Sequence, residues 1–122
     1  MTYKNLIVWQ KADEFAFEIY KVTKNFPKEE VYGLTSQMRR AVLSIPTNIV
    51  EGYARSGDKE LARFLSIAIG SMAEIEYLLS FSNRLGYLKD SEYARVENMR
   101  DEVGKLLWKF YKKIETSQPA SL

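Results

Sequence analysis

The chain contains no cysteine and no histidine among its 122 residues. Without cysteine there are no disulfide bonds and no thiolate chemistry, which fits a reducing compartment. Without histidine, the usual two-metal site of a helical bundle cannot be built, because that site needs Glu-x-x-His motifs. A Ser–His or Cys–His nucleophile is excluded for the same reason. The composition therefore argues against an enzyme, and it predicts no catalytic residues, no metal and no cofactor.

Strong net charge and long apolar runs are also missing. The chain has 18 basic and 16 acidic residues, and its net charge of +2 permits a nucleic-acid partner without requiring one. No run approaches the ~18 apolar residues that cross a bilayer. The first residues show no basic region followed by a long apolar stretch, so we expect no signal peptide. We expect a cytoplasmic protein that does not contact a membrane.

Apolar residues instead recur at helical spacing in segments at about 6–26, 35–55, 59–85 and 90–115. We take Asn5, Asp58 and either Asp90 or Ser91 as N-caps. Four helices joined by short turns predict an all-α, antiparallel up-and-down four-helix bundle. We expect one domain over residues 1–115 and a frayed tail over 116–122. The predicted core positions are Val8, Ala12, Phe15, Ile19, Val22, Phe26, Met38, Val42, Ile45, Ile49, Tyr53, Leu61, Leu65, Ala68, Met72, Ile75, Leu79, Val96, Met99, Val103, Leu106, Phe110 and Ile114.

A narrow polar stripe follows one side of segment 35–55, and a comparable stripe follows segment 59–85. The stripes comprise Gln37, Arg40, Ser44, Asn48, Glu51 and Arg55 on the first segment, and Arg63, Ser66, Gly70, Glu74 and Tyr77 on the second. Antiparallel packing sets Glu51 level with Arg63, and Arg40 level with Glu74. It also sets Asn48 level with Ser66 or Gly70, whose small size permits a close approach. We predict a polar seam that fixes helix register or forms a subunit interface. Direct contact with a ligand is a less favoured interpretation, and so is acid–base chemistry by Glu51 and Glu74.

Pro46 lies in the middle of segment 35–55. A proline there removes the hydrogen bond to the carbonyl of Val42 and bends the helix. Curvature around the core is the favoured interpretation, and a kink that shapes a subunit contact is the alternative.

Several stretches together resemble the 23S ribosomal RNA intervening-sequence protein family: "LIVWQKA", "FPKEEVYGLTSQMRRAVLSIPTNIVEGYAR", "FLSIAIGSMAEIEYLL" and "LGYL". The resemblance runs from about Tyr3 to Glu115. It implies a four-helix bundle assembled as a ring-like homopentamer. It also implies similarity to the accessory proteins of diversity-generating retroelements, which associate with a reverse transcriptase and nucleic acid. The family carries no settled biochemical activity.

The chain has more apolar surface than one small bundle needs. Phe64, Ile67, Ile69, Tyr77, Leu78 and Phe81 lie off the core stripe, and Phe17, Tyr53 and Trp108 add to them. Contiguous apolar patches usually mark interfaces, which agrees with assembly.

Two basic groups are candidate nucleic-acid contacts: Arg39, and the cluster Lys105, Lys109, Lys112 and Lys113. The alternative is that these lysines are solvated and match the dipole of the last helix. We expect a non-enzymatic homo-oligomeric scaffold that binds RNA or DNA through basic surfaces. The alternative is a protein–protein adaptor with no nucleic-acid binding.

Overall fold

The computed structural model describes residues 2–117. Its long helices are α1 (Ile7–Thr23), α2 (Leu34–Ala54), α3 (Asp58–Arg84) and α4 (Asp90–Thr116). Two short 3₁₀ helices, η1 (Tyr3–Asn5) and η2 (Lys28–Glu30), precede α1 and α2. Residues 2–117 contain no strand.

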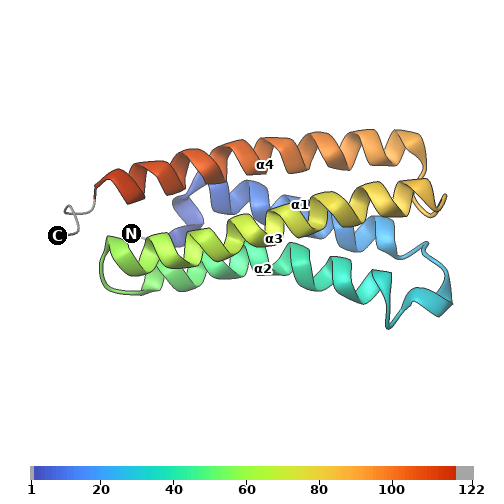
Figure 1. The fold of residues 1–122 in the computed structure, drawn as a ribbon, viewed down its shortest axis with the longest axis horizontal. Coiled ribbons are helices and arrows are strands. Elements are labelled where there is room, and N and C mark those ends of the chain that lie inside the picture. The colour runs from blue at the N-terminus through green and yellow to red at the C-terminus, as the bar shows by residue number, and fades with distance from the viewer. Residues whose placement is uncertain (1, 118–122) are drawn as a thin grey trace.

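Each long helix packs against the next one along the chain, and α1 also packs against α4. The helices lie side by side, and the chain reverses at each end of the bundle (Figure 1). The α2–α3 and α3–α4 connections are short, whereas the α1–α2 connection, residues 24–33, contains η2. The predicted all-α four-helix bundle is thereby confirmed. Helix α4 extends to Thr116, one residue into the predicted tail, and residues 118–122 lie outside the described part of the chain.

The helix starts differ by about one residue from the predicted caps. Asn5 lies in η1, and the N-cap of α1 is Leu6. The cap of α3 is Gly57, whose φ of 85° suits glycine, so Asp58 falls in the first turn, where its charge complements the helix dipole. The cap of α4 is Lys89, whose backbone N–H donates to the Glu92 carboxylate at 3.2 Å. Each predicted polar cap is therefore wrong.

The predicted core positions are largely buried. The largest fully buried side chains come from all four helices: Phe15 and Ile19, Met38, Ile45 and Ile49, Leu65, Ile75 and Leu79, and Val96 and Leu107. Burying one such aliphatic or aromatic side chain contributes about 1.5–3 kcal/mol. Phe64 and Leu78, predicted as surplus apolar surface, are buried in the bundle. Tyr53 and the α4 residues Met99, Leu106, Phe110 and Ile114 are only half-buried.

Helices α2 and α3 pack tightly against each other at Gly52. A Cβ atom there would lie 2.9 Å from Phe64 Cβ and 3.0 Å from Leu61 Cδ1. A Cβ at Gly70 would meet nothing within 4 Å. The close approach predicted at Gly70 and Ser66 therefore occurs at Gly52, near the α2–α3 turn.

Helix α2 continues through Pro46 as far as Ala54, and Pro46 itself is buried. The proline therefore does not end the helix.

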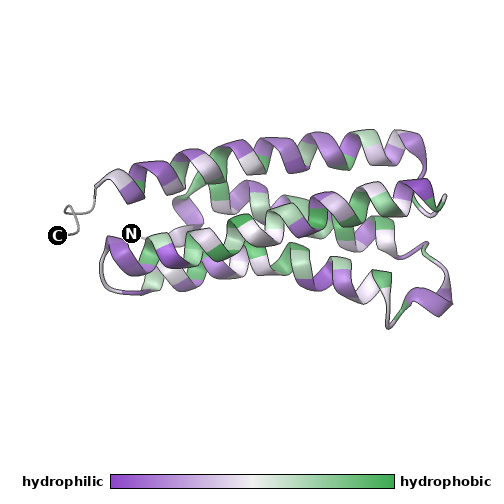
Figure 2. Ribbon diagram, viewed as in Figure 1, coloured by the Kyte–Doolittle hydropathy of each residue, from purple (hydrophilic) through white to green (hydrophobic). Residues whose placement is uncertain are grey.

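Helix α3 is the one helix in residues 2–117 that is long and apolar enough to cross a membrane, by length and composition only. Figure 2 shows hydrophobic residues along much of α3, whereas α4 is mostly hydrophilic. A helix at the core of a bundle passes the same test, and α3 packs between α2 and α4. This helix is a marginal exception to the expectation that no segment could span a bilayer.

Candidate functional site

The polar stripe of α2 meets α3 through a pair of hydroxyl groups. Ser71 Oγ donates to Ser44 Oγ at 2.7 Å, and this bond links the two helices. Asn48 Nδ2 donates to the Ser44 carbonyl at 2.7 Å and to Ser44 Oγ at 2.9 Å. Ser44, Asn48 and Ser71 are all half-buried. Asn48 thus bonds within its own helix and not to Ser66 or Gly70, and the interhelical link is made by Ser71.

Glu51, Arg55 and Arg63 of the stripes form ion pairs within their own helices. Arg55 lies 3.6 Å from Glu51, and Arg63 lies 2.8 Å from Glu60. Within residues 2–117, no ion pair joins Glu51 to Arg63 or Arg40 to Glu74. The predicted pairing of Glu51 with Arg63 is wrong, because each of these side chains has a partner three or four residues away on its own helix. Arg40 and Glu74 do come level across α2 and α3, but no ion pair joins them in the described residues.

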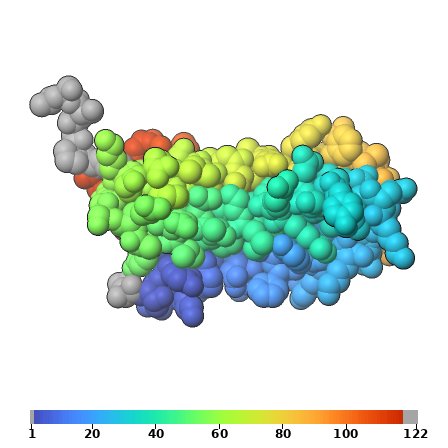
Figure 3. Space-filling model, turned by 90° about the horizontal axis from the view of Figure 1, so that it is seen from below, coloured from blue at the N-terminus to red at the C-terminus, as the bar shows by residue number. Residues whose placement is uncertain are grey.

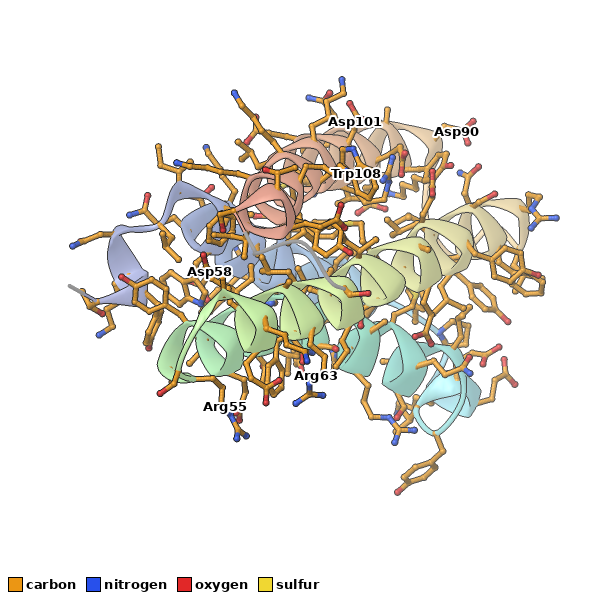
Figure 4. The ribbon with its side chains drawn as sticks, turned by 60° about the vertical axis from the view of Figure 1, so that its left-hand side comes forward. Arg55, Asp58, Arg63, Asp90, Asp101 and Trp108 are labelled. Atoms are coloured by element: carbon orange, nitrogen blue, oxygen red, sulfur yellow. The ribbon has the colours of Figure 1, made fainter. Side chains whose placement is uncertain are left out.

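Arg55 and Arg63 share an aromatic neighbour instead. Their guanidinium carbons lie 5.3 and 4.4 Å from the centre of the Phe64 ring. Figure 4 shows both arginines extending away from the bundle on the same side. They cover the ring and leave their charge in solvent.

Arg40 and Glu74 line a common hollow of about 280 Å³ between α2 and α3, together with Gln37, Ala41, Ser44 and Ser71. Both charged side chains are exposed. The hollow is a polar indentation of the surface, level with the Ser44–Ser71 bond.

Helix α3 carries an exposed stripe along its outward side. The stripe consists of Arg63, Ile67, Gly70, Glu74, Tyr77, Phe81 and Arg84, all exposed and spaced alternately by four and three residues. This spacing is the pattern of a seam between two packed helices. Tyr77 is 60% exposed, and its ring centre lies 6.0 Å from that of Phe81. No helix of residues 2–117 covers this set of residues, which we call the α3 stripe.

A second apolar surface lies between α1 and α2. Its groove has a volume of about 450 Å³ and is lined by Asp13, Ala16, Phe17, Tyr20, Lys21, Lys24 and Leu43. Phe17 is 64% exposed and Leu43 is 44% exposed. Figure 3 views the molecule from the side on which α2 lies between α1 and α3. We call this surface the α1–α2 groove.

Arg39, a candidate nucleic-acid contact, ties α2 to α1. Its Nε donates to Thr23 Oγ1 at 3.0 Å, and its Nη2 donates to the Tyr20 carbonyl at 3.3 Å. Its guanidinium carbon lies 4.7 Å from the centre of the Tyr20 ring. The side chain is half-buried, so its charge is directed into the bundle.

The lysine cluster of α4 is partly neutralised. Lys105 lies 2.9 Å from Asp101, and the hydrogen bond lowers the pKa of that carboxyl. Lys112 lies 3.0 Å from Glu115, whose pKa is lowered first by a hydrogen bond from Tyr111 and then by Lys112. Lys112 also lies over the ring of Trp108, at 5.5 Å from its centre.

Lys109 and Lys113 are exposed and form no ion pair within residues 2–117. They border a shallow hollow of about 230 Å³ with Leu6, Ile7, Val8, Leu106 and Phe110. Of the predicted contacts, these two lysines present the least compensated charge.

Sequence reasoning missed an ion-pair network around Arg100. This side chain is 12% exposed, and its Nη2 lies 2.7 Å from Glu97 and 3.4 Å from Glu76 on α3. The hydrogen bonds that it donates to Glu97 raise the pKa of Arg100 above its usual range. Glu97, three residues before Arg100, was a signal for a helical pair. The contact with Glu76 depends on how α3 and α4 pack.

The part of the chain that the structure describes contains no group of three acidic side chains placed to hold a metal ion. The fold and these surfaces define a small all-α bundle with uncovered apolar faces. A model of the 23S rRNA-intervening sequence protein family matches residues 4–109, and the chain belongs to this family. The resemblance drawn from its motifs is thereby confirmed.

A solved structure from Bacteroides thetaiotaomicron is similar over most of the chain. It is described as a protein of unknown function from the S23 ribosomal protein family. It is 29% identical, with a TM-score of 0.78, and the similarity covers 87% of this chain and 96% of that one. No curated protein matches the chain.

Proposed function

We propose that this protein is a non-enzymatic scaffold that assembles with copies of itself. The observation that carries the proposal is the α3 stripe, an exposed row that includes Ile67, Tyr77 and Phe81 at helix-packing spacing. A row of this kind on a charged surface is typical of an interface between protein chains. Self-assembly would cover the apolar side chains of the row.

The same geometry gives little support to catalysis. Glu51 and Glu74, the carboxylates considered for acid–base chemistry, are both exposed, and Glu51 is paired with Arg55. The hollow beside Glu74 is open and polar rather than closed to water. Catalytic acids and bases gain most from enclosed sites that exclude water.

A ring is the form of assembly that we favour. The α3 stripe and the α1–α2 groove are different surfaces on different helices. Contacts between unlike surfaces make rings when the rotation closes, and filaments when it does not. The family resemblance implies a ring-like homopentamer, and we adopt this form as the working proposal.

Light scattering coupled to gel filtration tests the scaffold proposal. We expect the wild-type chain to elute at a multiple of its 14.2 kDa mass. The double variant Tyr77→Asp/Phe81→Asp should elute as a monomer, because it places two charges in the stripe. Tyr32→Ser is the control, since Tyr32 is 97% exposed in the loop before α2. A wild-type monomer throughout the micromolar range would refute the proposal.

Nucleic-acid binding is a second candidate, favoured by the uncompensated charge of Lys109 and Lys113. An assembly would repeat this pair, and repetition converts a weak site into useful avidity. Phosphate contacts would make binding sensitive to salt and largely independent of sequence.

Fluorescence anisotropy with labelled RNA and DNA, at low and moderate salt, tests this second candidate. Lys109→Glu/Lys113→Glu should weaken binding at least tenfold, whereas Arg39→Met should leave it unchanged in the folded protein. If the wild type does not bind even at low salt, the alternative of a protein–protein adaptor becomes the working function.

A further inference from the structure

We infer that the α3 stripe of one copy docks into the α1–α2 groove of a second copy, with Phe17 seated against Gly70. This inference rests on the proposed self-assembly and adds to it the two surfaces that meet. Shape, height along the bundle and charge each support the contact.

The α3 stripe contains a hole between its side chains, of the kind that receives a side chain in knobs-into-holes packing. The α1–α2 groove contains a side chain that projects outward. Ile67, Gly70, Ser71 and Glu74 occupy positions i, i+3, i+4 and i+7 of α3, the arrangement that surrounds a hole in packed helices. Gly70 is open, because a Cβ atom there would meet nothing within 4 Å, so the floor of the hole is backbone. Phe17 projects from α1 with 64% of its surface exposed. Phe17 is more exposed than Leu43, the other large exposed apolar side chain of the groove, which makes it the side chain best placed to enter the hole.

Within one chain, Phe17 and Gly70 lie at the same height along the long axis of the bundle. A hydrogen bond between α2 and α3 supports this. Leu43 lines the groove beside Phe17 and directly precedes Ser44, which bonds Ser71 on α3. Ser71 directly follows Gly70. Two copies placed side by side, pointing the same way and without a shift along the bundle, therefore bring Phe17 opposite Gly70. A cyclic assembly around an axis parallel to the bundle requires this equality of height.

The charges around the two features are complementary. In an up-and-down bundle α1 and α3 run in the same direction. Lys21 follows Phe17 by four residues, and Glu74 follows Gly70 by four, so opposite charges meet one turn beyond the contact. On the other side of the contact Asp13 precedes Phe17 by four residues and Arg63 precedes Gly70 by seven, so these opposite charges lie about one turn apart, and Arg63 also pairs with Glu60. Lys24 adds further positive charge on the Glu74 side.

Pairing of the α3 stripe with itself fits less well. Two stripes crossing about their midpoint would bring the Glu74 carboxylates of both copies together, and like charges in contact are repulsive. That arrangement would also leave Phe17 and Leu43 exposed to water. The stripe-to-groove contact covers both apolar surfaces at once.

A mixing experiment tests the inference. Phe17→Asp damages only the groove, and Ile67→Asp damages only the stripe, at positions exposed within one chain. Each variant alone should sediment as a monomer. An equal mixture should form a one-to-one dimer, because the intact stripe of the first variant meets the intact groove of the second. A mixture that stays monomeric, or a Phe17→Asp variant that assembles like wild type, would overturn the inference.

A charge exchange provides an independent arm. Glu74→Lys should weaken assembly at least tenfold, and adding Lys21→Glu should restore most of it; no restoration counts against the pairing. Far-UV circular dichroism checks that each variant is folded, and Tyr32→Ser is the matched exposed control. A wild-type monomer defeats the scaffold proposal and this inference together. Assembly of the wild type that survives Phe17→Asp defeats this inference alone.

Discussion

Gly52 lies where the packing of α2 against α3 leaves no room for a side chain. Leu61 and Phe64 on α3 occupy the space that a side chain would need, at 3.0 and 2.9 Å from a Cβ atom. Such distances require the backbones to move apart or the neighbouring side chains to shift. Gly104 on α4 is different, because its nearest neighbours, Arg100 and Met72, lie at 3.6 and 3.8 Å.

We predict that Gly52→Ala lowers the free energy of unfolding by about 1–3 kcal/mol, the usual cost of overfilling a packed contact. Gly104→Ala should raise it by about 0.5–1 kcal/mol, because alanine favours the helix and its methyl group fits. Urea denaturation of the two variants beside wild type measures both effects. Equal effects at the two positions would contradict the packing described for Gly52.

Arg39 is a structural residue in this account. We predict that Arg39→Met lowers the free energy of unfolding by about 1–3 kcal/mol, since it removes the hydrogen bonds from a charged group to Thr23 and to the Tyr20 carbonyl. Thermal unfolding followed by circular dichroism measures the loss. If the variant is as stable as wild type and binds RNA or DNA more weakly, Arg39 contacts nucleic acid and is not a structural residue.

At the scale of the helices, α1 and α4 are joined by an ion pair. Arg95 Nη1 lies 2.5 Å from Glu18 Oε2. The hydrogen bond from Arg95 is the main reason that the pKa of Glu18 lies below its usual value of 4.5. Since the folded-state pKa is depressed, the pair stabilises the fold above pH 4.5 and ceases to do so as the pH falls through the lowered pKa.

We predict that Glu18→Gln is less stable than wild type at pH 7, by less than about 1 kcal/mol because Arg95 is half exposed. The difference should disappear as the pH is lowered below 4.5. Urea midpoints of both proteins between pH 3 and pH 7 provide the comparison. A difference that stays constant over this range would show that the Glu18 charge is not responsible.

The helices were predictable because their apolar residues recur at a spacing that sequence shows directly. The N-caps of the helices were harder to predict from sequence. Gly57, with its positive φ, is the N-cap of α3, and Asp58 therefore lies in the first turn. A helical wheel sets Arg40 level with Glu74, as the hollow that they share bears out, but it does not show whether two exposed side chains come within ion-pair distance. The Ser44–Ser71 bond and the Arg100–Glu76 contact depend on the exact packing of neighbouring helices, which no single segment encodes.

At the scale of the whole molecule, the α3 stripe and the α1–α2 groove are apolar faces that no helix of residues 2–117 covers. The core accounts for Phe64 and Leu78 but leaves Phe17, Ile67, Tyr77 and Phe81 in solvent. The sequence indicated this excess of apolar residues, and the structure places part of it on the α3 stripe and the α1–α2 groove, with Trp108 exposed on α4. We proposed assembly through these faces because they differ in shape and carry opposite charges, and such a contact would repeat from copy to copy.

Native mass spectrometry of the wild-type chain at micromolar concentrations tests the central claim most directly. The account predicts one dominant mass above the dimer, at a whole multiple of 14.2 kDa, as expected for a closed ring of unlike contacts. A spectrum containing only monomers, or only dimers, would contradict it.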